Sequence, residues 1–444
     1  MPIIALFFFA LISLFPVTAS AEGPPPLTLK ECINTALENN YALQAKREDV
    51  EAAKAGVGKA TSYFLPRLDV SETWMRSDNP VMAFGAKLNQ ERFTAADFSI
   101  DTLNEPAAID NFNFRVQATQ PIFNGGKEIV GFRRAKLGAQ AADKDFDRAR
   151  QETVNKAIQA YYGVALAGEY VKVASLAYRD AKGHEDLAQK FYGQGMLLES
   201  DLMLAKVRVA EMKELLIKAK NQEATAKAAL NFVMARPQDI DFTIAEPLEY
   251  REFGGDLKSL QGEALKNRPD LQGMQLNVKN MDCGVRLAKT DYLPNLNFVA
   301  RYELDDPDFF SGHGSSYTLL GMVTWNVFDG FLTTNNVREA RARANSTRHM
   351  YDQMREGVLF DVRRSWYNLQ EAKERIGATS ESVKEAEEAL RILEKRFQAG
   401  LAKTIDVLDA QTALTRARTD RVQALYDYNV SAASVNLAVG RADY

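Results

Sequence analysis

Residues 358–397 of this 444-residue chain run VLFDVRRSWYNLQEAKERIGATSESVKEAEEALRILEKRF. Apolar or small residues recur along this stretch every three or four positions, and Glu, Lys and Arg fill most positions between them. A mean step of about 3.5 residues is typical of a long helix that packs along its whole length on other helices. Because no proline follows residue 330, the pattern predicts one helix over about 332–397, roughly 100 Å long at about 1.5 Å per residue. The seam consists of Val358, Val362, Ser365, Leu369, Ala372, Ile376, Thr379, Val383, Ala386, Leu390, Leu393 and Phe397.

The same helix is encoded twice. Subtracting 205 from the seam positions between 358 and 383 again gives small or apolar residues, and residues 120–125 (QPIFNG) lie 205 positions before residues 325–330 (WNVFDG). Upstream of the strands the offset is 228, as between the Leu-Pro pairs at 65–66 and 293–294, so the first half carries 228 − 205 = 23 extra residues. A repeat this consistent predicts two homologous halves.

The chain divides accordingly. The apolar run 3–15 followed by Ala19-Ser20-Ala21 predicts a signal peptide over residues 1–21. Residues 22–235 form the first repeat, residues 236–257 a linker that contains Pro237 and Pro247, and residues 258–444 the second repeat. Each repeat is predicted to contain a helix, a β-hairpin, the long helix and a further helix. The half-length helices are expected at about 28–62, 200–234, 258–291 and 404–439.

Composition excludes several classes of protein. The formal net charge of −4, from 55 basic and 59 acidic residues, gives no argument for a nucleic-acid partner. His184, His313 and His349 are too scattered for a zinc-type spacing, so neither a metal nor a cofactor is expected. We find no nucleophile elbow or phosphate-binding loop, which indicates a protein that is not an enzyme. After residue 21 no apolar run reaches the length that a membrane-spanning helix needs.

The two cysteines are predicted to be free. The position in the second repeat that is equivalent to Cys32 is 32 + 228 = 260. Cys283 lies 283 − 260 = 23 residues beyond that position along the equivalent helix. That shift corresponds to roughly 35 Å, whereas disulfide-bonded Cα atoms lie within about 7 Å of each other.

Before each long helix the apolar period changes to two. Alternation predicts strands near 67–75, 111–119, 296–304 and 317–327, within hairpins over 67–123 and 295–328. One face is apolar, broken only by Glu72, and the connecting segments 77–110 and 305–315 are predicted to be loops on the outer side. Such strands fit a transmembrane β-barrel, and a soluble sheet that buries its apolar face is the alternative. The alternation places Phe112, Phe114, Leu319 and Trp325 towards lipid, and Asn113, Arg115 and Arg301 towards water.

Four strands cannot close a membrane barrel, because the two edges would leave unpaired backbone groups in hydrocarbon. Three copies would supply a twelve-stranded barrel and the walls of a helical tunnel. The fold class predicted here is mixed α and β, mostly α, with two tandem repeats in a homotrimer. A coiled-coil scaffold without a pore is the remaining alternative.

Five motifs carry a family resemblance. Residues 62–68 (SYFLPRL), 120–126 (QPIFNGG), 160–162 (AYY), 397–400 (FQAG) and 405–410 (IDVLDA) resemble motifs of the TolC-like outer membrane efflux protein family, in order and over essentially the whole mature chain. The resemblance implies a homotrimeric barrel embedded in outer membrane lipid, with a long α-helical extension in the periplasm. It also implies a periplasmic adaptor and an inner-membrane transporter as partners. The function implied is the exit duct of a tripartite efflux pump, or alternatively that of a type I protein secretion system.

The functional residues are expected at the far ends of the long helices. Three copies of an exposed acid around one axis would form a carboxylate ring that favours cations. By resemblance, Asp406 and Asp409 form the periplasmic constriction and Asp201 takes part in its latch, whereas an acid that only caps a helix is the alternative. Phe397 stands where the family's latch has a tyrosine, and Lys403 is a possible substitute for its arginine. The turns expected to meet the adaptor contain Gly195, Met196, Gly400 and Leu401, and the glycines also suit simple helix ends.

Overall fold

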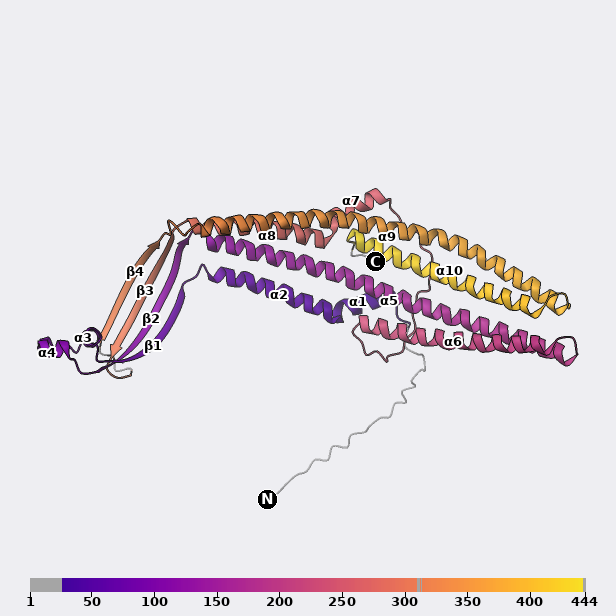
Figure 1. Ribbon diagram of the computed structural model, residues 1–444, viewed down its shortest axis with the longest axis horizontal. Helices are drawn as coiled ribbons and strands as arrows, with labels where there is room; N and C mark the ends of the chain where they lie inside the picture. The colour runs from indigo at the N-terminus through magenta and orange to yellow at the C-terminus, as the bar shows by residue number, and fades with distance from the viewer. Residues whose placement is uncertain (1–25, 310–311, 313, 442–444) are drawn as a thin grey trace, which may run out of the picture.

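The computed structural model describes residues 26–309, 312 and 314–441, and the predicted signal peptide lies outside the described residues. The protein is elongated, with a four-stranded sheet at one end and long helices that extend to the other (Figure 1). Helices α5 (Lys127–Gly193) and α9 (Leu332–Gln398) contain 67 residues each, and both begin beside the sheet. Within residues 26–309, 312 and 314–441, no helix is long and apolar enough to cross a membrane.

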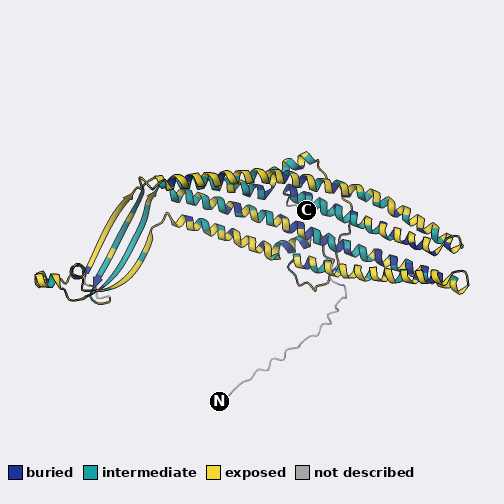
Figure 2. Ribbon diagram, viewed as in Figure 1, coloured by how far each residue is buried: buried dark blue, intermediate teal, exposed yellow. Residues whose placement is uncertain are grey.

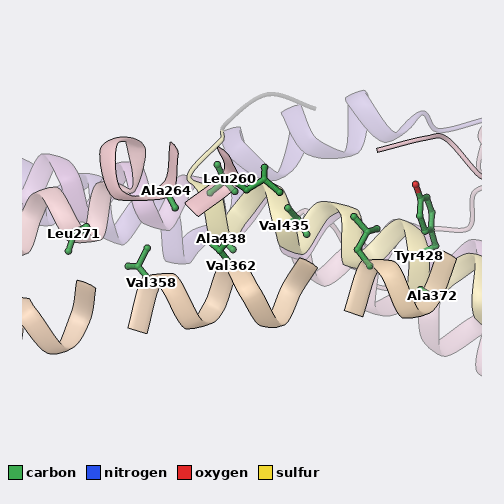
Figure 3. Close-up of a cluster of buried hydrophobic side chains, with 11 residues drawn as sticks. Leu260, Ala264, Leu271, Val358, Val362, Ala372, Tyr428, Val435 and Ala438 are labelled. Atoms are coloured by element: carbon green, nitrogen blue, oxygen red, sulfur yellow. The ribbon is translucent and has the colours of Figure 1, made fainter. Parts of the chain in front are cut away.

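The seam that predicts α9 is where this helix packs. Every seam residue from Val358 to Phe397 is buried or half-buried, as are the residues 205 positions earlier in α5 with the exception of Tyr192, which is exposed. In the middle of the protein, Val358 and Val362 pack with Leu260 of α7 (Leu257–Asn267) and Val435 of α10 (Thr404–Val439) (Figure 3). Burial of this kind stabilises a helix far more than its intrinsic propensity does, which accounts for its length.

Two columns of shorter helices accompany the long ones. Helix α5 is flanked by one column and α9 by the other, and α5 also contacts α8 and α10, so it lies between the two columns (Figure 1). The first column comprises α1 (Leu29–Asn39), α2 (Tyr41–Ser62) and α6 (Glu199–Val233). The second comprises α7 (Leu257–Asn267), α8 (Pro269–Lys289) and α10 (Thr404–Val439).

The two half-length helices that precede the strands are each broken, which the sequence analysis did not predict. Asn40 leaves the helical conformation at ψ 119°, its side chain caps α2 and its amide donates to the carbonyl of Val233. Arg268 adopts a similar conformation, with ψ 117°, because Pro269 disfavours the helical conformation in the residue before it. Thr28 and Glu31 form a capping box at the start of α1.

The sheet is antiparallel in the order β1–β2–β3–β4, and its register sorts side chains by chemistry. Its strands are β1 (Arg67–Ser77), β2 (Ile109–Asn124), β3 (Asn295–Asp306) and β4 (Gly314–Thr324). Ala118 pairs with Ala300, and Ala300 with Leu319, so Leu319 shares a face with Phe112 and Phe114 as predicted. Asn113, Arg115 and Arg301 alternate onto the opposite face, which we call the polar face.

Three predictions at the sheet were wrong. Strand β4 ends at Thr324, so Trp325 lies beyond it, because Thr324 pairs with Asn295, the first residue of β3, and no ladder partner remains. The segment 77–110 is not a simple loop, since it contains the helices α3 (Pro80–Asn89), η1 (Ala95–Phe98) and α4 (Ile100–Asn104). The second connection is shorter than expected, because β3 extends to Asp306 and β4 begins at Gly314.

The two cysteines are buried free thiols in different helices. Cys32 lies in α1 and Cys283 in α8. Burial, with a smaller contribution from Glu246, raises the pKa of the Cys32 thiol to about 12. A thiol held in its neutral form is a poor nucleophile, so Cys32 is expected to act as a packing residue.

Candidate functional site

The end of the molecule farthest from the sheet consists of two turns with similar geometry. Gly195 and Gly400 have φ values of 70° and 73°, a conformation that favours glycine. In the first turn the N–H of Met196 donates to the carbonyl of Phe191 at 2.9 Å, and in the second Leu401 donates to Arg396 at 2.8 Å. Both bonds close the preceding helix in the manner of a Schellman motif.

Each turn exposes a large apolar side chain at its outermost point. Met196 is 63% exposed and Leu401 is 69% exposed. Isolated exposed apolar residues are common, but here each directly follows the glycine of a turn, and the turns close the two helical hairpins at the end of the molecule farthest from the sheet (Figure 2). Each tip turn therefore carries an exposed apolar side chain directly after its glycine.

The acids expected to form a constriction follow directly after the turns. Asp406 and Asp409 are both exposed and lie three residues apart in the first turns of α10, so they share one face of the helix. The carboxylate of Asp406 accepts the backbone N–H of Lys403 at 2.9 Å, which is a helix-capping contact. Asp409 lies one turn further along and can contribute charge without that capping role. Asp201 is half-buried in the first turn of α6.

Phe397 occupies the interior of the tip and not its surface. Its ring stacks on that of Phe191 with centroids 5.7 Å apart, and the ring of His184 lies 4.8 Å from it. The apolar cluster around Phe397 includes Val407 of α10 and Leu390 of α9. Phe397 therefore joins the α5–α6 hairpin to the α9–α10 hairpin through aromatic packing. It has no hydroxyl with which to form the hydrogen bond that a tyrosine would make at this position.

His184 is a site residue that the sequence analysis did not single out. It is 6% exposed, and its Nε2 atom has no hydrogen-bond partner among the described residues. Burial lowers the pKa of its imidazole. Its position could have been found from a second apolar stripe on α5, in which Ala177, Ala181, His184 and Ala188 follow at steps of four, three and four.

A cavity of about 270 Å³ opens beside this imidazole. Asp180 and Arg179 of α5 line it, as does Glu394 of α9. Burial, and then the negative charge of Asp180, raise the pKa of Glu394. No group of three or more potential metal ligands occurs within the described part of the chain.

The packing at His184 predicts a pH-dependent tip. A histidine whose folded pKa is lowered contributes stability that is complete above its unfolded pKa of about 6.5 and declines as the pH falls towards the folded value. Hydrogen-exchange protection of residues 184–200 and 390–405 should therefore fall several-fold between pH 7.5 and pH 5.5. In the H184Q variant, which cannot be charged, this fall should be much smaller.

The charges that face His184 from the two packed helices work in different directions. Protonation of Glu394, whose pKa is raised, stabilises the tip as the pH falls, and Asp180 and Arg179 line the same cavity. All three groups are retained in H184Q, so the difference between the two proteins isolates the imidazole. Equal losses of protection in both proteins would assign the effect to groups other than His184.

A family model described as outer membrane efflux protein matches residues 32–236 and 260–441. The chain is 23% identical over 425 residues to the alkaline protease secretion protein AprF of Pseudomonas aeruginosa, which covers 94% of this chain and 85% of AprF. It is 21% identical over 422 residues to the outer membrane protein TolC of Escherichia coli, with coverages of 90% and 80%. A solved structure of CusC has a TM-score of 0.80 at 16% identity, over 93% of this chain and 92% of that one.

Proposed function

The chain belongs to the outer membrane efflux protein family, and we propose on that premise that it is an outer-membrane exit duct that works passively, without enzymatic activity. It conducts cargo from a periplasmic adaptor and an inner-membrane transporter to the exterior. The observation that carries this proposal is the sheet with one apolar and one polar face at the end of two 67-residue helices.

The edges of the sheet support a trimer. Strands β1 and β4 each pair with one neighbour within the described residues, so each has a free edge. Free edges in hydrocarbon cost several kcal/mol per unsatisfied group, and a barrel closed from three copies removes them with twelve strands. Large apolar side chains are also exposed along the helical part, including Phe232, Ile217 and Phe360, and neighbouring copies would cover them.

The polar face suits a water-filled lumen. Arg115 donates to Glu303 at 2.8 Å, and Arg301 donates to the side-chain oxygen of Gln117 at 3.1 Å. These charged groups lie in the middle of the strands, at the depth of the membrane, where lipid contact would be costly. The opposite face, with Phe112 and Phe114, suits lipid.

Molecular mass in detergent tests the proposal most directly. The purified protein should be a trimer by light scattering, with the mass of bound detergent subtracted, and should form channels in planar bilayers. A monodisperse monomer that retains its strand content and does not conduct ions would overturn the barrel.

Adjacent cysteines test the orientation of the sheet. We expect a membrane-impermeant maleimide to label N113C in the assembled protein and to label F114C poorly, because consecutive residues face the lumen and the lipid. The native thiols Cys32 and Cys283 are buried and should give little background. Equal labelling of the two variants contradicts the register, and the unsubstituted protein is the control.

A type I secretion duct is the second candidate, and AprF supports it because that relative is a protease secretion protein. Within either system, the tip turns at Met196 and Leu401 meet the adaptor, and Asp406 and Asp409 form the constriction. Asp201, Lys403 and Phe397 hold the closed tip, Phe397 through its aromatic packing. Copurification of the protein with its transporter identifies which system it serves.

A further inference from the structure

The 23 extra residues of the first repeat lie in the connection between β1 and β2, at the end of the sheet farthest from the long helices (Figure 1). We define the exit segment as residues 78–108. Its helices are held together by the rings of Phe84, Phe93 and Phe98, whose centroids lie 4.9 to 6.5 Å apart in edge-to-face arrangements. Lys87 forms an ion pair with Asp97 at 2.5 Å, and this bond is the main cause that lowers the pKa of Asp97 to about 2.

The exit segment is anchored to the sheet through Gln90. This side chain is fully buried, and its amide donates to the carbonyl of Asp110 and to the side-chain oxygen of Asn111, both at 2.8 Å. Asn111 in turn donates to the carboxylate of Asp305 at 2.7 Å. A buried polar network with its members paired fixes one geometry, because each broken bond would leave a desolvated group.

A close backbone approach extends the anchor to β4. A Cβ atom on Gly314 would lie 1.7 Å from the carbonyl oxygen of Asn89, the last residue of α3. Only glycine permits this contact. The end of α3 therefore contacts β2 and β4, the two neighbours of β3, and β3 joins the network through Asn111, so the end of α3 crosses the outer end of the sheet.

All of these contacts lie on the polar face. Met75 pairs with Asn111 across β1 and β2, and Asp305 pairs with both Asn113 and Gly314. Paired residues share a face, and so do residues two apart on one strand, which places the anchoring residues with Asn113. Ala83 and Ala86 of α3 pack with Met75 and Ile109 on that same face.

We propose that the exit segment is a fixed partial lid over the outer mouth of the duct, and that it sets an upper size limit for cargo. The inference rests on the proposed function, in which the polar face lines the lumen. A segment anchored on that face lies inside the rim of the barrel and not in the surrounding lipid. Gln90 is a positioning residue, since it acts by holding α3 and not by touching cargo.

Polymer exclusion from the outer side measures such a lid. Neutral polymers that enter a pore lower its conductance, so the largest polymer that still does so reports the width of the mouth. Replacing residues 80–106 with Gly-Ser-Gly-Ser removes most of the lid and should widen the mouth. The largest polymer that still enters from the outer side should then be about two-fold or more heavier, because a wider pore admits larger solutes. Q90A should raise this polymer mass limit in the same direction, and E105A, which changes an exposed residue of the same segment, should leave it unchanged.

The outcomes of the polymer experiment distinguish the proposed function, the lid and the role of Gln90. If the unsubstituted protein forms no channel, the proposed function fails and this assay cannot rescue it. If the protein conducts and the shortened variant, still trimeric, keeps the same outer polymer limit, then the lid is overturned while the duct remains. If only the shortened variant shifts and Q90A does not, then the lid stands and Gln90 loses its positioning role.

Discussion

Alanine at both Asp406 and Asp409 is expected to remove most of the channel's preference for cations and to weaken its block by multivalent cations added from the periplasmic side. Two exposed carboxylates from each copy lie on one face of α10, directly after the tip turn. In the proposed trimer they crowd one narrow opening, where a ring of like charge attracts cations. We expect the ratio of cation to anion permeability in planar bilayers to fall several-fold.

Asparagine at the same two positions separates charge from helix capping. Asp406 accepts the backbone N–H of Lys403, the contact that an acidic residue in the first turn makes with the residue that begins the helix. The double Asn variant retains an acceptor oxygen for this N–H and loses the charge, so it should conduct like the double Ala variant. If both variants discriminate ions like the parent, these acids serve as helix caps and the constriction lies elsewhere.

Y161A is expected to destabilise the helical part of the protein by about 3–5 kcal/mol, the range for removing a large buried aromatic side chain. Tyr161 is fully buried in α5. Its hydroxyl donates to the carbonyl of Leu27 at 3.1 Å and bonds to the carboxylate of Glu246, whose own N–H donates to the hydroxyl at 3.0 Å. One side chain therefore ties α5 to the start of the first repeat and to the linker between the repeats.

The midpoint of the helical melting transition, followed by circular dichroism at pH 7.5, measures this effect. Y161F keeps the ring and loses only the hydroxyl, so about 1–2 kcal/mol is expected for the bonds lost. Y367F changes a tyrosine that is 55% exposed and should not move the midpoint. A midpoint unchanged in Y161A would mean that the linker contributes little to the helical fold.

The sequence predicted the features that depend on regular local patterns. The seam from Val358 to Phe397 specifies α9 almost to the residue, because burial every three or four positions is a property of one helix. Met196 and Leu401 follow tip glycines that the repeat aligned, and both turns were observed. The alternation of apolar and polar residues likewise placed Arg115 and Phe114 on opposite faces of the sheet, and this prediction did not require the strand pairing.

The breaks at Asn40 and Arg268 show where local patterns were insufficient. Pro269 is a local signal for the second break, because proline disfavours the helical conformation in the residue before it. The local sequence gives a weaker signal for a break at Asn40. Its helix-ending conformation is stabilised by the hydrogen bond from its side-chain amide to the carbonyl of Val233 in α6, which lies far away in the sequence. Helices α3 and α4 are short enough that docking on the sheet, and not their own propensity, decides whether they form.

The sequence by itself therefore determined the two long helices, their repeat, the tip turns and the two faces of the strands, because each follows from spacing within one segment. Only the tertiary structure decided that His184 is buried, that Phe397 joins two hairpins and that Gln90 anchors α3 on the polar face. These features depend on which segments meet. Burial and hydrogen bonding between distant residues are set by the packing of α5 between two columns and by the register of the sheet.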